Sequence, residues 1–571
     1  MNEKKNRFHV SAENFAKIPG SPIAYWVGKE IFNAFSEFPQ MEKLGHPKVG
    51  MQTSNNEKFL RLWHEISFGD FSHSPYAKPK WIKYLKGGPF RRWYGNLDYL
   101  LFYNGSKDYI EKQKNARVLD LSFLSKHKCT WTDLTSGNNS FRLAPIDTFY
   151  DISGHCFFPS EEDQYWLLAC SNSKPFNMLL GIINSSFHCQ VGDVSRIAVP
   201  LLKSCLKDII SNTSRELVSL SRSDWDDYET SWDFKVNPLV REGWQKGEGG
   251  MSLEAAWDRV FARRMEWAAR MKELEEVNNR LFIEAYGLED ELKPDVAWKD
   301  VSITGNPFYR YKVDGEVDAA RRDTSPHQGV PEELEARARA DAVRELISYG
   351  IGCLMGRYSL EQEGLILASQ GETYQDYFSR VHGVDKLRPD DDGILPVVAG
   401  ETAFTDNAPY RVVDFIKAAF GEEHLTENLN FIEATLGMTL EAYLTKGFWD
   451  DHKRTYKNRP IYWLFRSKKG AFQALVYMHR MDAYTATKVR NGYLLPHIEF
   501  LRGRIAAESA RGAELTAKER TKLKKMQQAM EECLEYDGRL HVVADRMQGI
   551  NLDDGVAVNY AKFGDVLAKL K

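Results

Sequence analysis

The sequence lacks the features of membrane and exported proteins. Its 571 residues contain no run of about 18 apolar residues, and residues 1–7 are mostly polar. A signal peptide would need an apolar stretch close to the start of the chain. We therefore expect no membrane span and a cytoplasmic location.

Cysteine is scarce, and no Cys-x-x-Cys pair occurs among the seven cysteines. This pattern indicates reduced thiols and disfavours a disulfide framework or a four-cysteine zinc site. Two cysteines follow a histidine directly, at His155-Cys156 and His188-Cys189. Adjacent side chains of a strand point to opposite faces, so each doublet is a poor chelate. We expect no metal site from these residues.

Common catalytic motifs are also missing. The sequence has no His-Glu-x-x-His, no Gly-x-Ser-x-Gly and no Gly-x-x-x-x-Gly-Lys-Ser/Thr, which disfavours a zinc protease, an α/β-hydrolase or a P-loop nucleotidase. The acidic run Asp390-Asp391-Asp392 could hold Mg²⁺ in a nuclease. Pro389 and Gly393 flank it, and this favours a solvent-facing turn or a helix start.

Basic and aromatic residues are concentrated in one part of a mildly acidic chain. The net charge is -4, yet residues 78–128 hold twelve Lys/Arg against four Asp/Glu, so the remainder sums to about -12. Within residues 78–96 the basic residues alternate with aromatic rings around Gly87-Gly88-Pro89. Such a mixture suits a phosphate backbone and exposed bases. The alternative is a solvated strand face whose lysine stems cover core aromatics.

Two polar turns lie on either side of this segment. The first carries Thr53, Asn55 and Asn56 and precedes an apolar, basic stretch that includes Arg61; the second contains Gln190. Thr and Asn side chains can bond phosphates or base edges, and Gln can pair with adenine through two hydrogen bonds. Equally, these residues could only shape a turn before a strand or helix, or cap one.

The pattern of elements predicts an α+β protein. Short apolar bursts separated by Gly and Asn indicate a β-rich domain over residues 1–245, and a glycine-rich linker follows near 245–250. Apolar residues then recur at helical spacing from 253 to about 286, and residues 250–571 read as a mainly helical domain with a long helical region near 486–536. Residues 314–333 are charged and poorly hydrophobic, which predicts a mobile loop.

Several segments together resemble one protein family. They resemble the C-terminal half of the PglX-type adenine-specific DNA methyltransferases of BREX phage-defence systems, which are related to the TaqI-like and MmeI-like enzymes. The resemblance covers nearly the whole chain, with one departure at Ser54, where the family tends to have Gly. The segments are 15–26 (FAKIPGSPIAYW), 50–63 (GMQTSNNEKFLRLW), 81–96 (WIKYLKGGPFRRWYGN), 130–137 (TWTDLTSG), 184–200 (NSSFHCQVGDVSRIAVP), 224–234 (DWDDYETSWDF), 351–360 (IGCLMGRYSL), 389–392 (PDDD), 459–463 (RPIYW) and 552–556 (LDDGV).

The resemblance implies that catalysis lies outside this chain. In the family, the half that carries the S-adenosylmethionine loop and an Asn-Pro-Pro-Tyr motif precedes the target-recognition half. Here Asn306-Pro307-Phe308-Tyr309 is similar to that motif, but Phe308 replaces the second proline and no Phe-x-Gly-x-Gly loop lies upstream. We expect no catalytic residue, no cofactor in this chain, and S-adenosylmethionine only with the catalytic half. This polypeptide alone should not methylate DNA.

The favoured hypothesis is therefore a target-recognition half of an adenine-N6 DNA methyltransferase. Its expected partners are duplex DNA and either the catalytic half or other defence-system proteins. The alternative is a structural or interaction subunit that does not touch DNA, and an autonomous methyltransferase would have to bind S-adenosylmethionine. The predicted contacts are Thr53, Asn55, Asn56 and Arg61 in the first turn, Lys83, Lys86, Arg91 and Arg92 at phosphates, and Gln190 near the bases.

Overall fold

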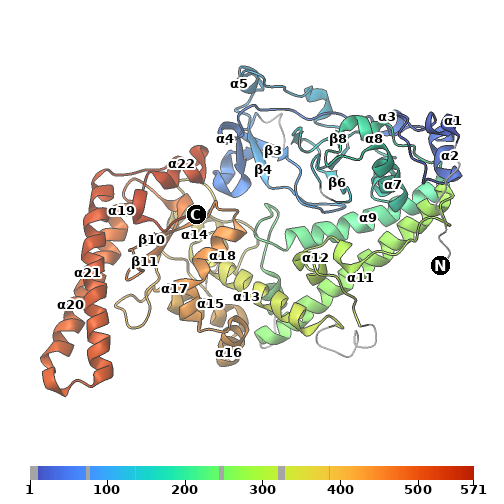
Figure 1. The fold of residues 1–571 in the computed structure, drawn as a ribbon. Helices are drawn as coiled ribbons and strands as arrows, with labels where there is room; N and C mark the ends of the chain where they lie inside the picture. The colour runs from blue at the N-terminus through green and yellow to red at the C-terminus, as the bar shows by residue number, and fades with distance from the viewer. Residues whose placement is uncertain are drawn as a thin grey trace, which may run out of the picture. The chain divides into compact units, whose positions relative to one another are not determined.

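The computed structural model describes residues 11–72, 78–135, 137–243, 250–318, 328–384 and 386–570 (Figure 1). About 51% of the structure is helix and about 9% is strand. The structure is thus mixed, as expected for an α+β protein, and helix is in large excess. The predicted linker near 245–250 lies mostly outside the described residues, as does the middle of the predicted loop at 314–333. None of the described helices is both long and apolar enough to cross a membrane.

The chain forms two compact units that interleave along the sequence. Unit 1 comprises the residues up to Leu60, Phe71–Asp226 and Phe261–Leu334, and unit 2 comprises Arg61–Asp70, Asp227–Val260 and the residues from Glu335 onward. The sequence predicted two consecutive domains divided at 245–250. The units differ from that division because helix α11 (Leu253–Tyr286) starts in unit 2 and continues into unit 1.

The strands of unit 1 lie in two small sheets. Strand β3 (Trp81–Leu85) pairs antiparallel with β4 (Tyr99–Phe102) and parallel with β2 (Phe71–Ser72) and β7 (Phe149–Tyr150). In the second sheet, β5 (Lys128–Trp131) pairs antiparallel with both β6 (Phe141–Ala144) and β8 (Cys156–Phe157). Every residue of β3 and β5 is buried. The sequence predicted a β-rich domain over residues 1–245, but its described strands are short and lie between β1 (Leu60–Leu62), next to β4 in the first sheet, and β8, while helices occupy more of this region.

Helices make up most of the remainder of unit 1. Ser173 starts α7 (Lys174–Ile183) because its hydroxyl accepts the backbone N–H of Phe176. The long α9 (Ser204–Asp226) and α11 carry carboxylates that bond the segment after β3, as described below. The other helices are α1 (Ala12–Phe15), α2 (Lys29–Glu37), α3 (Met41–Gly45), α4 (Asn56–Phe59), α5 (Asp108–Glu111), α6 (Gln164–Ser171), α8 (Val191–Ser195) and α12 (Pro307–Tyr311).

Unit 2 packs helices around one antiparallel sheet of order β10-β11-β9, with β10 at Tyr462–Arg466, β11 at Gln473–Tyr477 and β9 at Ile394–Pro396. The predicted helical region near 486–536 is present but interrupted. Helix α21 (Ala517–Asp545) begins after a break because Thr516 and Glu519 form a reciprocal capping box. The other helices are α10 (Pro238–Gly243), α13 (Glu332–Leu354), α14 (Tyr374–Arg380), α15 (Ala408–Phe420), α16 (Leu425–Leu436), α17 (Leu440–Lys446), α18 (Phe448–Thr455), α19 (Thr485–Lys488), α20 (Leu495–Ala510) and α22 (Gly555–Ala561).

Candidate nucleic-acid interface

Three loops of unit 1 meet around residues 150–154. The N–H of Asp151 donates to the Leu85 carbonyl at 2.8 Å, next to the Gly87-Gly88-Pro89 turn. The N–H of Met51, just before the first polar turn, donates to the Tyr150 carbonyl at 2.8 Å, and that of Asp133 donates to the Ser153 carbonyl at 3.0 Å. Backbone hydrogen bonds thus bring together segments that are far apart in the sequence.

The loop that carries Gln190 joins the same group through Asp133. The N–H of Cys189 donates to the Asp133 carbonyl at 2.7 Å, while the Asp133 carboxylate lies 2.8 Å from Nδ1 of His188 and accepts a bond from Nε2 of Gln190 at 2.5 Å. Leu134 and Phe187 stand beside them, 61% and 68% exposed. We call residues 51–56, 86–89, 132–135 and 187–190 the loop platform.

The first polar turn is organised by its own side chains. Thr53 is buried, and its hydroxyl donates to Oδ1 of Asn56 at 2.8 Å. The Oδ1 of Asn55 accepts the backbone N–H of Lys58 at 3.0 Å and so caps α4. Both asparagines remain exposed. The alternative of turn-shaping or capping therefore applies to all three residues, while Asn55 and Asn56 also stay exposed on the platform.

Arg61 lies in unit 2 and is not part of this platform. Its Nε and Nη2 donate to the Asp553 carbonyl at 3.1 and 2.7 Å. This double contact joins Arg61, the middle residue of β1 (Leu60–Leu62), to the turn before α22 within unit 2. The sequence grouped Arg61 with the first turn only because the two are neighbours along the chain.

The basic-aromatic segment is mainly interior. Lys83 is buried within β3, and Arg91 and Arg92 are 3% and 8% exposed. The Nη2 of Arg91 lies 2.8 Å from Asp224 of α9, and Nη1 of Arg92 lies 2.7 Å from Glu275 of α11. These two buried ion pairs attach the segment to α9 and α11. Their guanidinium groups are therefore not available to a ligand.

Lys86 is partly exposed. Its side chain is 24% exposed, and its Nζ lies 3.7 Å from the Asp151 carboxylate. More exposed cations follow in Lys112, Lys114 and Arg117. Arg117 lies beside the platform, since its backbone pairs with that of Gln52 through bonds of 2.8 and 2.9 Å. The sequence count of positive charge included these three residues, but counting alone could not distinguish exposed cations from buried ones.

A cavity of about 590 Å³ adjoins the platform within unit 1. Gly88, Thr132 and Leu134 of the platform line one part of it, and Lys299, Tyr309 and Lys312 line another. Three cations, Lys299, Arg310 and Lys312, and one carboxylate, Asp300, are among its lining residues. Together with the exposed cations it gives unit 1 a surface suited to phosphates and polar base edges.

The segment that is similar to a catalytic motif forms part of the wall of this cavity, but its asparagine is occupied. Asn306 is fully buried, and its Oδ1 accepts the N–H of Phe308 at 3.1 Å. Its Nδ2 donates to the carbonyls of Trp298 and Val301 at 2.7 and 3.0 Å. Both ends of the amide thus hold the start of α12, and its oxygen, which would have to accept from an adenine amino group, is already bonded to the Phe308 N–H.

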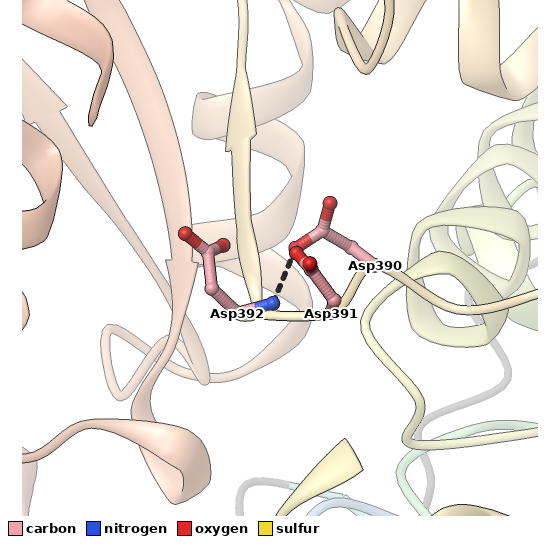
Figure 2. Close-up of side chains that lie close together, drawn as sticks. All are labelled: Asp390, Asp391 and Asp392. Atoms are coloured by element: carbon pink, nitrogen blue, oxygen red, sulfur yellow. Dashed lines mark hydrogen bonds between the residues drawn. The ribbon is translucent and has the colours of Figure 1, made fainter.

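The acidic run in unit 2 forms a tight cluster, with carboxylate oxygens of Asp390, Asp391 and Asp392 within 4.8 Å of one another (Figure 2). Asp390 is buried, and its Oδ1 accepts the backbone N–H groups of Asp392, Gly393 and Ile394 at 3.2, 2.8 and 3.2 Å. Burial, with the adjacent Asp392, raises the pKa of Asp390 to about 7. The cluster is the turn before β9, and its oxygens bond backbone groups.

Comparison with known proteins gives the family relationship. No protein-family model matches the chain. The chain is 33% identical over 593 aligned positions to the adenine-specific methyltransferase BrxX of Escherichia coli O9:H4 (strain HS), with 100% of this chain and 46% of the relative covered. It is also 31% identical over 586 positions to the adenine-specific methyltransferase PglX of Lacticaseibacillus casei (strain Zhang). That alignment covers 97% of this chain and 45% of the relative.

The chain is a homologue of PglX-type proteins. The resemblance to this family is therefore confirmed over essentially the whole chain. The chain spans about half the length of these relatives. Its assignment to the C-terminal half of PglX-type proteins, and the relation to TaqI-like and MmeI-like enzymes, stay predictions.

Proposed function

We propose that this chain is the DNA target-recognition part of a PglX-type adenine-specific methyltransferase in phage defence. The observation that carries the proposal is the loop platform of unit 1, where four separate loops place polar, cationic and apolar side chains on one surface. Relatives named adenine-specific methyltransferases support the DNA substrate. Loops fixed to a rigid scaffold are a common location for recognition residues.

Phosphate contacts belong, in this proposal, to the exposed cations. Lys86 supplies charge on the platform, Arg117 beside it, and Lys112 and Lys114 in the exposed segment that precedes Arg117. Lys83, Arg91 and Arg92, which the sequence predicted at phosphates, are buried and hold the fold instead. Charged side chains at phosphates supply affinity and register, and they do not select a sequence.

Base contacts belong to the polar ends of the platform. His188 and Gln190 are held by one carboxylate, that of Asp133, so their free ring and amide edges are pre-oriented. Asn55 and Asn56 add exposed amides from the first turn. Amides can satisfy the paired donor and acceptor of adenine in the major groove of a duplex.

Methyl transfer lies outside this chain in the proposal. The Asn306 amide is committed to α12 and its neighbours, which removes the nearest candidate for holding an adenine. The S-adenosylmethionine site would therefore be supplied by the catalytic half of such a methyltransferase. DNA binding and catalysis can then be tested separately.

Duplex binding by the full chain, measured by fluorescence anisotropy between about 50 and 200 mM salt, tests the proposal. The triple variant Lys112→Ala, Lys114→Ala, Arg117→Ala should bind more weakly. The slope of log affinity against log salt should become shallower by up to about 0.9 for each phosphate that is no longer neutralised. The matched control is Lys522→Ala, Lys524→Ala, Lys525→Ala, which removes three exposed charges from α21 of unit 2.

Two results would contradict DNA recognition by the platform. One is an absence of duplex binding at the lowest salt, which would favour the alternative of a structural subunit without DNA contact. The other is an equal loss of affinity in the two triple variants, since this would show that only total charge matters.

A further inference from the structure

Unit 2 contains a large cavity far along the sequence from the platform residues, with a volume of about 980 Å³. Its walls come from α18, the end of β10, α21, α22 and residues 564–570. Drug-sized and cofactor-sized ligands occupy cavities of roughly 300–1,000 Å³. The sequence motifs gave no sign of it, because its lining residues are dispersed over about a hundred positions.

Cations predominate on the cavity lining. Five basic residues face three acidic ones, Asp450, Glu535 and Asp565. The basic residues are Lys453, Arg466, Lys468, Arg539 and Lys569. The cavity therefore favours an anion over a cation of similar size.

Part of this positive charge has no acidic partner. Lys453 pairs with Asp450 at 2.9 Å, and Arg539 pairs with Asp565 at 2.9 Å. Within the described part of the chain, no ion pair is found for Arg466 or Lys468. Three buried guanidinium nitrogens in the same part have no hydrogen-bond acceptor: Nε of Arg466, and Nε and Nη2 of Arg539. Buried donors of a guanidinium are nearly always bonded in stable sites. Phosphate oxygens are the acceptors that match this fork of donors.

Aromatic rings form the other part of the wall. Trp449 and Tyr560 lie nearly parallel, with ring centroids 6.5 Å apart and an angle of 17° between them. Lys453 adds a cation–π contact, its Nζ 5.7 Å from the Trp449 ring centroid. Both side chains are largely buried, 8% and 6% exposed, so a planar base would meet only the parts of the rings that line the cavity, next to its surplus cationic donors.

We infer that this cavity binds a nucleotide, either free or as part of a nucleic-acid strand. The phosphate lies against Arg466, Lys468 and Arg539, and the base lies against the edges of Trp449 and Tyr560. This site is separate from the loop platform, belongs to the other unit, and does not depend on the function proposed for unit 1.

The test is calorimetric titration of the full chain with two probes, ATP and a twelve-residue oligothymidylate. Two variants remove pocket charge: Arg539→Ala, and Lys468→Glu at an exposed position that tolerates change. Lys524→Glu on the exposed surface of α21 is the matched control. Lys468→Glu also guards against misfolding as an explanation, since it leaves the ion pair between Arg539 and Asp565 in place.

We expect that at least one probe binds the parent chain. Each pocket variant should lower the affinity for that probe at least tenfold, and Lys524→Glu should change it less than twofold. Tighter ATP binding identifies a free nucleotide, and tighter oligothymidylate binding identifies a strand. Oligothymidylate binding should persist when Lys112, Lys114 and Arg117 are replaced by alanine, because those residues belong to unit 1. The inference is overturned if neither probe binds at millimolar concentration, or if the control variant weakens binding as much as the pocket variants.

Discussion

The Arg92 guanidinium lies 2.7 Å from the Glu275 carboxylate, and both side chains are buried. The same carboxylate accepts a hydrogen bond of 2.6 Å from the indole N–H of Trp93. One acidic residue of α11 therefore anchors two consecutive residues of the segment that looked most like a DNA contact. The relationship assigns these residues a role in folding.

Replacing Arg92 by alanine should destabilise unit 1 by about 3–5 kcal/mol, because it leaves the Glu275 charge buried without its partner. Urea denaturation followed by tryptophan fluorescence measures the decrease. Lys114→Ala is the control: it removes an exposed cation and should change stability by less than about 0.5 kcal/mol.

The same two variants should show the opposite order in DNA binding. Folded Arg92→Ala protein should bind duplex DNA almost as well as the parent, whereas Lys114→Ala should weaken binding measurably. A stable Arg92→Ala variant with no DNA affinity would restore the hypothesis of a phosphate contact at this residue.

Gln190→Ala should relax sequence preference more than it lowers affinity. Its amide is held by Asp133 at 2.5 Å, so its position is fixed before DNA arrives, and removing a good bidentate pairing with a base costs about 1–3 kcal/mol of discrimination. Selection of bound duplexes from a random pool, compared with the parent protein, measures the change. An unchanged preference would remove Gln190 from the base contacts.

Asn306→Ala should lower the free energy of unfolding by about 2 kcal/mol, because three buried backbone groups would lose their hydrogen-bond partner. Asn138→Ala, at an exposed position lining the same cavity, should have little effect. Calorimetry with S-adenosylmethionine should show no difference between either variant and the parent chain. Donor binding that depends on Asn306 would indicate a catalytic role.

His452 should make unit 2 less stable in mild acid. Its Nε2 accepts the backbone N–H groups of Ile461 and Tyr462 at 3.2 and 3.1 Å, which requires a neutral ring. Burial, with a smaller contribution from Arg357, lowers the pKa of His452 to about 3. Since the folded pKa lies below the usual value of about 6.5, the stabilisation is complete above that value and disappears as the pH falls towards 3.

The expected decrease in stability from this group between about pH 7 and pH 5 is about 2 kcal/mol. The Gln side chain in His452→Gln keeps an acceptor oxygen and cannot titrate. Between pH 7 and pH 5 the free energy of unfolding of this variant should therefore decrease by about 2 kcal/mol less than that of the parent chain. His541→Gln, at an exposed position of α21, serves as the control and should follow the parent chain. Parallel pH dependence in the parent and His452→Gln would show that this ring does not control acid stability.

Much of the local structure could be predicted from the sequence. Helix α11 ends at Tyr286 as its apolar spacing indicated, and the helical region near 486–536 is present as α19, α20 and α21. The turn at Asp390 was also expected from its flanking Pro and Gly, but its predicted exposure to solvent was wrong for Asp390, which is buried. These features depend on local patterns, namely periodicity, capping and turn residues, which a single sequence contains.

The partners of charged residues could not be predicted in this way. Arg91 and Arg92 looked like phosphate contacts because their carboxylates, Asp224 and Glu275, lie more than a hundred positions away. Gln190 and Lys86 lie in separate turns, and long-range backbone hydrogen bonds through Asp133, Asp151 and Ser153 bring those turns together. Long-range pairing decides which cations are exposed, and neither composition nor spacing contains it.

In the proposed recognition role, the buried Glu275 also limits how the DNA target could change during evolution. A gene exchange that imported only residues 71–226 would bring a new Arg92 but leave the old Glu275, because the latter belongs to the segment Phe261–Leu334 of the same unit. Such a hybrid would inherit a mismatched interior. New specificities should therefore arise by substitution within the loops of the platform, or by transfer of both segments together.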